Sequence, residues 1–549
     1  MQPTFILYII LFLFHPTQSK PVPINPFAAE TSGKEALSST SYALLPEQKS
    51  ITESIIPETR IESPGQLKIT CLTIGSRGDV QPYIALCKGL QEANHVCTIA
   101  THPEFKNWIE SHGIRFVSIG GSPVELIKHC TENGVLSPGF WVKGLAKFGE
   151  WYQDLLKQSY TALEDQHVLI ESPSAMVGTH VAEALQIPYY RAFTMPWTQT
   201  SQYPHAFAPQ SLRHIPFYNS MSYKVFDFGV WLGIKKHVNI WRKEKGLQGL
   251  SYLALRKRKY PFLYNFSPSV VEKPKDWDSS VSITGYWFLN DKPNPVADEP
   301  EKVGLPVDLK EFIGKARLEG KKIVYIGFGS IVVEDPTKMT QTIVDAVKDA
   351  DVYAVVSAGW SGRGTEGTDQ VVEQRKQFTD KMFHVDSVPH DLLFSEIDAA
   401  VHHGGAGSTG ASLRGILLPR LNFYLARARR VEELGVGTSL KKLDSDQLAK
   451  ALKTATQDPD QIERARAIGA QIRQEDGVAN AIQAIYRHYG ETRTMVRQYA
   501  LESETFDKQT SVWERLVNKM ATMAMFIITF APRMIYRGAH IVTKPKLIR

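Results

Sequence analysis

The glycine-rich stretch HHGGAGSTGAS, residues 402–412, carries the strongest sign of chemistry in this sequence. A predicted strand ends there and a predicted helix follows. Glycine permits positive φ angles and lets backbone N–H groups approach an anion closely, and a helix N-terminus adds partial positive charge. Ser408 and Thr409 can donate hydroxyl hydrogen bonds to a phosphate, and His403 can donate from the strand end. The turn predicts a diphosphate site, although glycine also serves close strand–helix packing.

A second turn, GSRGDVQP at residues 75–82, places polar groups at the end of an earlier predicted strand. Asp79 follows a glycine there, so its carboxylate can face a cleft and take a proton from an acceptor hydroxyl as a general base. The spacing supports equally well a second interpretation, in which Asp79 caps the helix that follows. Ser76 and Arg77 can reach a phosphate across the cleft, although Arg77 can equally be a solvated surface residue.

Two other strand ends in the second half of the chain carry polar groups. In GFGS, residues 327–330, Ser330 can bond a phosphate; in VPHDLLF, residues 388–394, the backbone of Val388 and the ring of His390 can bracket a flat base. Either segment can also be ordinary turn chemistry. Because three such turns converge on one edge of a predicted sheet, the pattern favours a nucleotide-binding site.

These turns require elements that bring them together. From Leu67 onward, short apolar runs such as LKITCL and VCTIATH alternate with segments of helical periodicity such as VQPYIALCKGLQEANH. This alternation predicts a parallel sheet with helices on both faces, whose ligands bind at the carboxyl ends of the strands. The alternation restarts after a Pro-rich, acidic stretch from Asn290 to Pro306. The predicted fold class is therefore α/β, with two doubly wound, Rossmann-like domains facing across a cleft.

The chain of 549 residues divides into four predicted parts. Residues 1–66 form an apolar N-terminal segment and mobile leader, 67–300 the first domain, 301–490 the second, and 491–549 a C-terminal tail. A content of 43% hydrophobic residues suits large buried cores. The net charge of +6, from 63 basic and 57 acidic residues, gives no case for a nucleic-acid partner.

The cysteines and the two chain ends bear on the compartment. Four cysteines fall in one early segment without the paired short spacing of a zinc site, which favours buried free thiols and a reducing compartment. The apolar run FILYIILFLF, residues 5–14, has the length of a signal-peptide core and is too short to span a bilayer, but no Lys or Arg precedes it. The apolar run from Met520 into a basic tail can lie in a membrane interface or pack as a helix on its own protein.

Six motifs resemble, in the same order, those of the sterol glucosyltransferases, a GT-B family that uses UDP-glucose: GSRGDVQPYIAL, MPWTQTSQYPHAFAP, YPFLYNFSPSVV, TGYWFLN, VPHDLLF and HHGGAGSTGASLR. The resemblance covers roughly residues 66–489. It implies transfer of glucose from UDP-glucose to the 3-hydroxyl of a membrane sterol, with inversion at the sugar carbon. It implies no metal and no cofactor beyond this co-substrate, because the helix end and His403 would stabilise the leaving diphosphate.

The resemblance also assigns roles to individual residues. Asp79 matches the residue that activates the sterol hydroxyl. Together with the turn residues above, the predicted donor contacts are Ser76, Arg77, Ser330, Val388, His390, His403, Gly405, Ala406, Gly407 and Ser408. On the acceptor side, Trp197, Tyr203, His205 and Phe207 are predicted to line an apolar slot, for which the alternative is plain core packing.

The sequence departs from the family after ASLR. Where the family has a Phe-Gly-Asp-Gln segment whose Asp and Gln bond the glucose hydroxyls, this chain carries Arg427, Arg429 and Arg430, and an arginine cannot accept a hydrogen bond. Three explanations remain open. Residues 415–430 are an error in the gene model, or a true change that leaves nucleotide binding with little transfer, or a site for a donor whose carboxylate pairs with arginine.

These observations predict a UDP-glucose:sterol glucosyltransferase of lipid and steroid metabolism. The alternative is an inactive nucleotide- or sterol-binding homologue at a membrane surface, because the sugar-binding segment is missing. A cytosolic donor and a membrane acceptor predict a cytoplasmic protein that is peripheral on membranes, with the N-terminal apolar segment as a signal or anchor. No nucleic-acid partner is expected, and the sequence does not identify protein partners.

Overall fold

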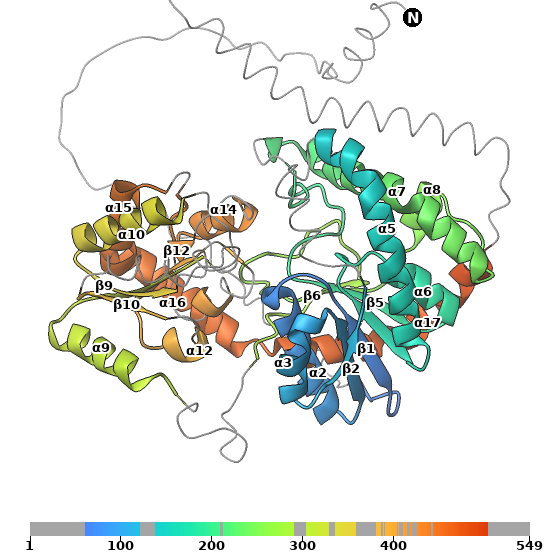
Figure 1. Cartoon of the computed structure of the whole chain (residues 1–549), viewed down its shortest axis with the longest axis horizontal. Helices are drawn as coiled ribbons and strands as arrows, with labels where there is room; N and C mark the ends of the chain where they lie inside the picture. The colour runs from blue at the N-terminus through green and yellow to red at the C-terminus, as the bar shows by residue number, and fades with distance from the viewer. Residues whose placement is uncertain are drawn as a thin grey trace, which may run out of the picture. The chain divides into compact units, whose positions relative to one another are not determined.

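Two parallel β-sheets, each covered by helices, organise the chain (Figure 1). The computed structural model describes residues 61–120, 138–208, 212–289, 304–328, 335–357, 380–385, 388, 390–402, 404–405, 410–413, 418–419, 425–440 and 443–502. The predicted signal or anchor, most of the leader and the basic tail from residue 503 lie outside these ranges.

The first sheet has seven parallel strands in the order β3-β2-β1-β4-β5-β6-β7. Alternate residues of β1 face opposite sides, as the two-residue period of a strand requires: Ile69 and Cys71 join one core cluster, whereas Leu72 joins another. Both faces are therefore buried. The strands are β1 (Lys68–Leu72), β2 (Val96–Thr101), β3 (Arg115–Ser118), β4 (Val168–Glu171), β5 (Tyr189–Phe193), β6 (Phe262–Tyr264) and β7 (Val281–Ile283).

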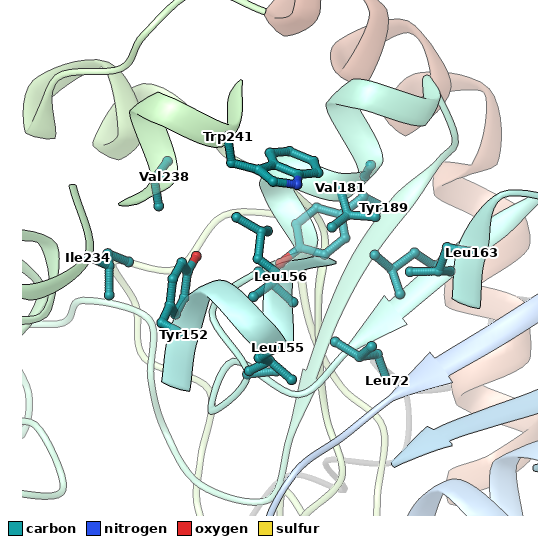
Figure 2. Packing of buried hydrophobic residues seen from close by; sticks show 14 of the residues in the cluster. Leu72, Tyr152, Leu155, Leu156, Leu163, Val181, Tyr189, Ile234, Val238 and Trp241 are labelled. Atoms are coloured by element: carbon teal, nitrogen blue, oxygen red, sulfur yellow. The ribbon is translucent and has the colours of Figure 1, made fainter. Parts of the chain in front are cut away.

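Helices cover both faces of this sheet. One core cluster receives side chains from α2, α3 and α17, and the other receives them from α5, α6, α7 and α8. Figure 2 shows the second cluster, in which Tyr152, Leu156 and Trp241 pack over Leu72 and Tyr189. The elements are α2 (Arg77–Glu92), the 3-10 helix η2 (Pro103–Phe105), α3 (Lys106–Ser111), α5 (Pro138–Leu163), α6 (Gly178–Leu185), α7 (Pro216–Glu244), α8 (Tyr252–Lys257) and α17 (Gly477–Leu501).

The second sheet has five parallel strands in the order β10-β9-β8-β11-β12. On β8, Val324 and Ile326 pack toward α10 and α15, while Ile323 and Tyr325 pack toward α9. The strands are β8 (Ile323–Gly327), β9 (Tyr353–Ser357), β10 (Met382–His384), β11 (Ala399–His402) and β12 (Leu418–Pro419). The helices are α9 (Val307–Leu318), α10 (Pro336–Ala350), α12 (His390–Leu393), α14 (Leu425–Glu433), α15 (Ser445–Gln457) and α16 (Pro459–Gln474).

The predicted α/β class with two doubly wound sheets is confirmed. The helix α17 crosses the predicted boundary between the second domain and the C-terminal tail. The predicted boundary at residue 490 falls inside α17, which packs against α2, α6 and β5 of the first sheet. The division into four parts otherwise stays a prediction.

Three of the four cysteines lie in the described residues. Cys71, Cys87 and Cys97 are buried and free, as predicted, whereas Cys130 falls outside the described residues. Burial raises the pKa of the Cys87 thiol well above its ordinary value. No helix in the described part of the chain is both long and apolar enough to cross a bilayer.

Candidate functional site

The turn between β1 and α2 holds Asp79 in a fixed position. Gly75 has a φ of +130°, a conformation that side-chain-bearing residues rarely adopt, and a Cβ there would lie 2.4 Å from the Asp79 Oδ2 atom. Glycine therefore lets the carboxylate fold back over the turn. The Oδ2 atom accepts the Ser76 backbone N–H at 2.7 Å and the Ser76 hydroxyl at 3.0 Å.

This geometry corrects one of the two interpretations of Asp79. Ser76 is the N-cap of α2, and Asp79 is the third residue of the helix, where its carboxylate accepts the backbone N–H of the N-cap. Such reciprocal bonding is a capping box. Asp79 thus supports the helix N-terminus without being the cap itself. Its role as a general base stays a prediction.

Arg77 and His390 interact electrostatically, although they belong to different sheets. The Arg77 guanidinium lies over the Trp108 ring, 4.3 Å from its centroid, and partial burial lowers the pKa of Arg77. Burial, and next to it the charge of Arg77, lower the pKa of His390 to about 4. The imidazole is therefore neutral at physiological pH, and the two predicted donor contacts are close enough for one to influence the other.

The His390 ring stands at the start of α12 between aromatic neighbours. It stacks on Phe394 with centroids 4.7 Å apart and planes at 11°, and its Nε2 atom lies 3.2 Å from the Tyr325 hydroxyl oxygen. A flat, neutral and half-buried ring suits contact with a flat base. Val388 is half-buried and packs against the hydrophobic cluster that contains Tyr325 and Phe394. Recognition of a base by these two residues stays a prediction.

Only part of the glycine-rich turn is described. β11 ends at His402, whose Nδ1 atom accepts the Gly404 backbone N–H at 3.0 Å, and Gly404 has a φ of +83°. Gly405 follows, and residues 410–413 are helical, as expected of a strand–turn–helix unit. The other predicted phosphate contacts lie outside the described residues: Ser330, His403, Ala406, Gly407 and Ser408.

The arginine-rich segment carries the helix α14. Arg430 donates from Nε to the Val270 carbonyl oxygen at 2.6 Å, and its other nitrogens lie 3.7 Å from carboxylate oxygens of Glu272 and Glu433. Arg429 is exposed. The Arg430 guanidinium is therefore engaged by the chain itself, which weakens the explanation in which the arginines pair with a donor carboxylate. The Arg427 side chain lies outside the described residues.

The four predicted acceptor residues gather in one aromatic cluster. Trp197 contacts His205 and Phe207 edge-on at centroid distances of 4.7 and 5.9 Å. His205 stacks on Phe226 at 4.1 Å. Tyr203 meets the Trp277 ring at 6.3 Å. The side chains pack on one another, so the geometry accommodates core packing as well as an acceptor slot.

Three polar atoms in and beside this cluster set it apart from an ordinary apolar core. The hydroxyls of Tyr203 and Tyr223 and the Nε2 atom of His205 are buried and have no hydrogen-bond partner among the described residues. Buried polar groups are normally paired. Burial also lowers the pKa of His205 to about 3, so its ring is neutral. An acceptor hydroxyl is one group that can satisfy such atoms.

Two carboxyl groups outside the predicted site residues have a pKa close to neutrality. Burial raises the pKa of Asp227, which follows Phe226 on α7, to about 6. Burial also raises the pKa of Glu475 to about 7, although it accepts hydroxyl hydrogen bonds from Ser267 and Ser269. Neither residue lies in a recognisable motif, and only the packing around it produces the shift. No group of three His, Cys, Asp or Glu side chains in the described ranges is arranged to hold a metal ion.

Two family models match the chain, one in each half. Residues 69–204 match the glycosyltransferase family 28 N-terminal domain. Residues 368–483 match the erythromycin biosynthesis protein CIII-like C-terminal domain. The first match spans the turn that holds Asp79, and the second spans the glycine-rich turn.

Curated relatives match most of the chain. The sterol 3-beta-glucosyltransferase of Cryptococcus neoformans var. neoformans serotype D (strain JEC21) is 51% identical over 449 residues, which are 79% of this chain and 28% of that protein. The sterol 3-beta-glucosyltransferase of Emericella nidulans is 50% identical over 444 residues, which are 80% of this chain and 31% of that protein. The chain thus spans less than a third of the length of these relatives.

Solved structures share the fold. The glycosyltransferase of kitacinnamycin superimposes with a TM-score of 0.55 at 18% identity, covering 78% of this chain and 100% of that one. The calicheamicin glycosyltransferase CalG4 does so with a TM-score of 0.56 at 15% identity, covering 77% and 98%. At these identities the likeness concerns architecture alone. The chain therefore has the GT-B fold, and about half of the residues that it aligns with the two relatives above are identical to those of proteins named sterol 3-beta-glucosyltransferase.

Proposed function

We propose that this chain transfers glucose from UDP-glucose to the 3-hydroxyl of a membrane sterol, with inversion at the sugar carbon. The observation that carries the proposal is the identity of 51% over 449 residues and of 50% over 444 residues with proteins named sterol 3-beta-glucosyltransferase. A homologue that only binds is the alternative. The relatives reported above are all named as transferases, which leaves that alternative without support.

In the proposed reaction the sterol oxygen attacks the anomeric carbon of glucose. Asp79 takes the hydroxyl proton as the new carbon–oxygen bond forms, and the bond to the diphosphate breaks so that UDP leaves with the electron pair. The Ser76 N–H and hydroxyl hold the carboxylate in place. The helix after the glycine-rich turn would stabilise the charge that develops on the leaving diphosphate. The reaction needs no metal or further cofactor.

The acceptor would meet the aromatic cluster. Trp197 and Phe207 offer apolar faces to a sterol ring system, and polar atoms of Tyr203 and His205 that have no hydrogen-bond partner among the described residues offer partners for its hydroxyl. We further propose that the protein works in the cytoplasm as a peripheral protein on membranes, because UDP-glucose is a cytosolic donor and the acceptor lies in a bilayer.

The proposal is tested by incubating the purified full chain with radiolabelled UDP-glucose and vesicles that contain ergosterol or cholesterol. Labelled steryl glucoside in the organic extract is the expected result. UDP binding by calorimetry without any labelled product would instead establish the binding-only homologue. Parallel reactions with UDP-glucuronic acid address the arginine-rich segment: product only with that donor would overturn glucose as the transferred sugar.

A separate test addresses residues 415–430, where the sequence differs from the family's Phe-Gly-Asp-Gln segment. If the segment is a gene-model error, the sequenced transcript encodes an Asp-Gln pair in place of the arginines. A transcript that encodes the arginine segment as written removes this explanation, and the activity of the protein as printed then decides between the other two.

A further inference from the structure

Positive charge is concentrated on one stretch of the first domain. Residues 216–260, which include α7 and α8, carry ten Lys or Arg and two Asp or Glu, a net charge of +8, whereas the whole chain has +6. The rest of the chain is therefore slightly acidic. The basic residues are Lys224, Lys235, Lys236, Arg242, Lys243, Lys245, Arg256, Lys257, Arg258 and Lys259.

Two of these ten basic side chains are buried, and others are exposed to solvent. Arg242 and Arg258 are buried and pair with Glu183. The exposed cations Lys235, Lys236, Lys243 and Lys257 have no ion-pair partner among the residues that the structure describes. Since their charge is not used within the described fold, it is available to a partner.

Exposed apolar side chains accompany these lysines. In the described ranges, eight large apolar side chains are exposed; three of them belong to residues 216–260 and a fourth, Ile215, directly precedes this stretch: Ile215 (39%), Phe217 (66%), Ile240 (45%) and Leu253 (36%). Ile215 is the N-cap residue of α7 and Phe217 lies in its first turn. α8 packs on α7, because the buried rings of Tyr252 and Phe228 meet edge-on with centroids 5.1 Å apart. Figure 1 shows the two helices side by side. The α7–α8 surface is defined here as these four residues with Lys235, Lys236, Lys243 and Lys257.

The inward side of α7 holds the predicted acceptor residues. Asn219, two residues after exposed Phe217, donates to the Ser201 carbonyl oxygen at 2.9 Å. The Ser222 hydroxyl oxygen accepts the His205 backbone N–H at 2.8 Å. The Phe226 ring stacks on His205. The helix that carries exposed apolar and basic groups therefore also positions the aromatic cluster.

We propose that the α7–α8 surface docks on a membrane with anionic lipid headgroups. Basic side chains with apolar neighbours match such an interface: the lysines attract the anionic headgroups, and the apolar side chains bury at the acyl boundary. A nucleic-acid backbone would use the cations but would leave Phe217 and Ile215 exposed. Docking would bring the acceptor cluster next to the bilayer, and only this consequence rests on the proposed function.

Vesicle co-sedimentation of the full chain tests the proposal without donor or sterol. Binding to phosphatidylcholine vesicles that contain phosphatidylserine is expected, with weaker binding to phosphatidylcholine alone and at high salt. The double variant Lys235→Glu/Lys236→Glu should bind at least about thirtyfold more weakly, because each of the two lysines contributes about 1 kcal/mol near an anionic surface and a factor of ten corresponds to about 1.4 kcal/mol. Phe217→Ser should also weaken binding, without a change in its salt dependence.

Matched control variants show whether vesicle binding depends on the α7–α8 surface. Lys450→Glu/Lys453→Glu makes the same charge change on exposed positions of α15 and should leave binding unchanged. Equal loss in both double variants, or loss only when the tail residues Arg533 and Arg537 are reversed, would overturn the proposal. So would lysine-dependent binding of a DNA duplex with no binding of vesicles.

Transfer assays separate this proposal from the proposed function. With sterol presented in cyclodextrin, the Lys235→Glu/Lys236→Glu variant should keep wild-type turnover; with sterol in anionic vesicles, it should lose turnover in parallel with binding. A chain that binds vesicles through this surface but makes no product would leave docking established and the transferase function refuted.

Discussion

At the scale of single residues, Asp79 combines a structural and a proposed chemical duty. Its carboxylate bonds the N-cap of α2, so a substitution can reduce activity simply by loosening the helix. Asp79→Asn separates the two, since an amide oxygen still accepts the Ser76 N–H. We expect unfolding free energy within about 1 kcal/mol of wild type and a turnover lower by roughly 10²- to 10⁴-fold, measured by denaturation and by the labelled-glucose assay.

Asp444→Asn is the matched control for this experiment. Asp444 caps α15 by accepting the Gln447 N–H at 2.9 Å and lies in no predicted contact. It should show a similarly small stability change with wild-type turnover. Comparable loss of turnover in both variants, or full turnover in Asp79→Asn, would rule out Asp79 as the base.

The buried Tyr203 hydroxyl gives a second prediction at this scale. Tyr203→Phe removes a buried hydroxyl without a described partner, so the unliganded protein should be as stable as wild type, or more stable by up to about 1 kcal/mol. If the acceptor hydroxyl normally meets this atom, KM for the sterol should rise several-fold. Tyr260→Phe is the control, because that hydroxyl bonds buried Glu183 at 3.0 Å and its loss should destabilise by about 1–3 kcal/mol. Unchanged KM in Tyr203→Phe would contradict a contact with the acceptor.

At the scale of elements, the junction between α16 and α17 depends on one carboxyl group. Glu475 follows α16, and its Oε1 atom accepts the Ser267 hydroxyl at 2.5 Å, while its buried Oε2 atom has no partner among the described residues. A Cβ on Gly285, which has a φ of +94°, would lie 3.1 Å from Oε2. The segment after β6 and the start of α17 therefore meet around this side chain.

This junction should make stability depend on pH. Burial raises the pKa of folded Glu475 to about 7, above its ordinary value of 4.5, so the folded state holds the proton more tightly than the unfolded state. The stabilisation is fully present below pH 4.5 and is lost as the pH rises through about 7. Against Glu475→Gln, wild type should lose about 2 kcal/mol of unfolding free energy between pH 5 and pH 8, after allowance for solvent screening.

Denaturant titrations at both pH values provide the measurement. Glu463→Gln, which neutralises an exposed carboxyl on α16, controls for the loss of charge itself. A wild-type minus Glu475→Gln difference that stays constant with pH would refute the assignment.

The elements also show how far sequence reasoning reaches. Short continuous apolar runs with helical runs between them predicted β1, α2, β2 and the second series from β8, because burial on both faces of a parallel sheet leaves that pattern in the sequence. The sequence also places the turn that contains Gly75 and Asp79. Spacing alone does not show whether Asp79 is the N-cap of α2 or the residue that bonds the N-cap, Ser76. The raised pKa of Glu475 and the burial of the Tyr203 hydroxyl arise from contacts between distant segments, which no local pattern encodes.

At the scale of the whole molecule, the last described helix, α17, contributes side chains to the hydrophobic core of the first sheet. α17 follows the second sheet in sequence but packs against β5 and α2 (Figure 1). Ile485 and Ile482 join the core cluster that contains Ile69 of β1. The Tyr190 hydroxyl donates to the Ile485 carbonyl oxygen at 2.7 Å. The first domain is therefore not a contiguous stretch of sequence, and its stability depends on residues about 400 positions beyond its first strand.

This dependence predicts a large effect from a small change far along the chain. Ile485 is fully buried, so Ile485→Ala should lower the unfolding free energy by about 2–5 kcal/mol. Leu501→Ala, on the same helix but at a side chain that is 78% exposed, should change it by no more than about 0.5 kcal/mol. Fluorescence of the first domain's buried tryptophans during denaturation is the measurement, because it reports on the sheet that α17 covers. If both variants unfold at the wild-type denaturant concentration, α17 does not contribute to that core, and the first domain must fold from residues 61–289 alone.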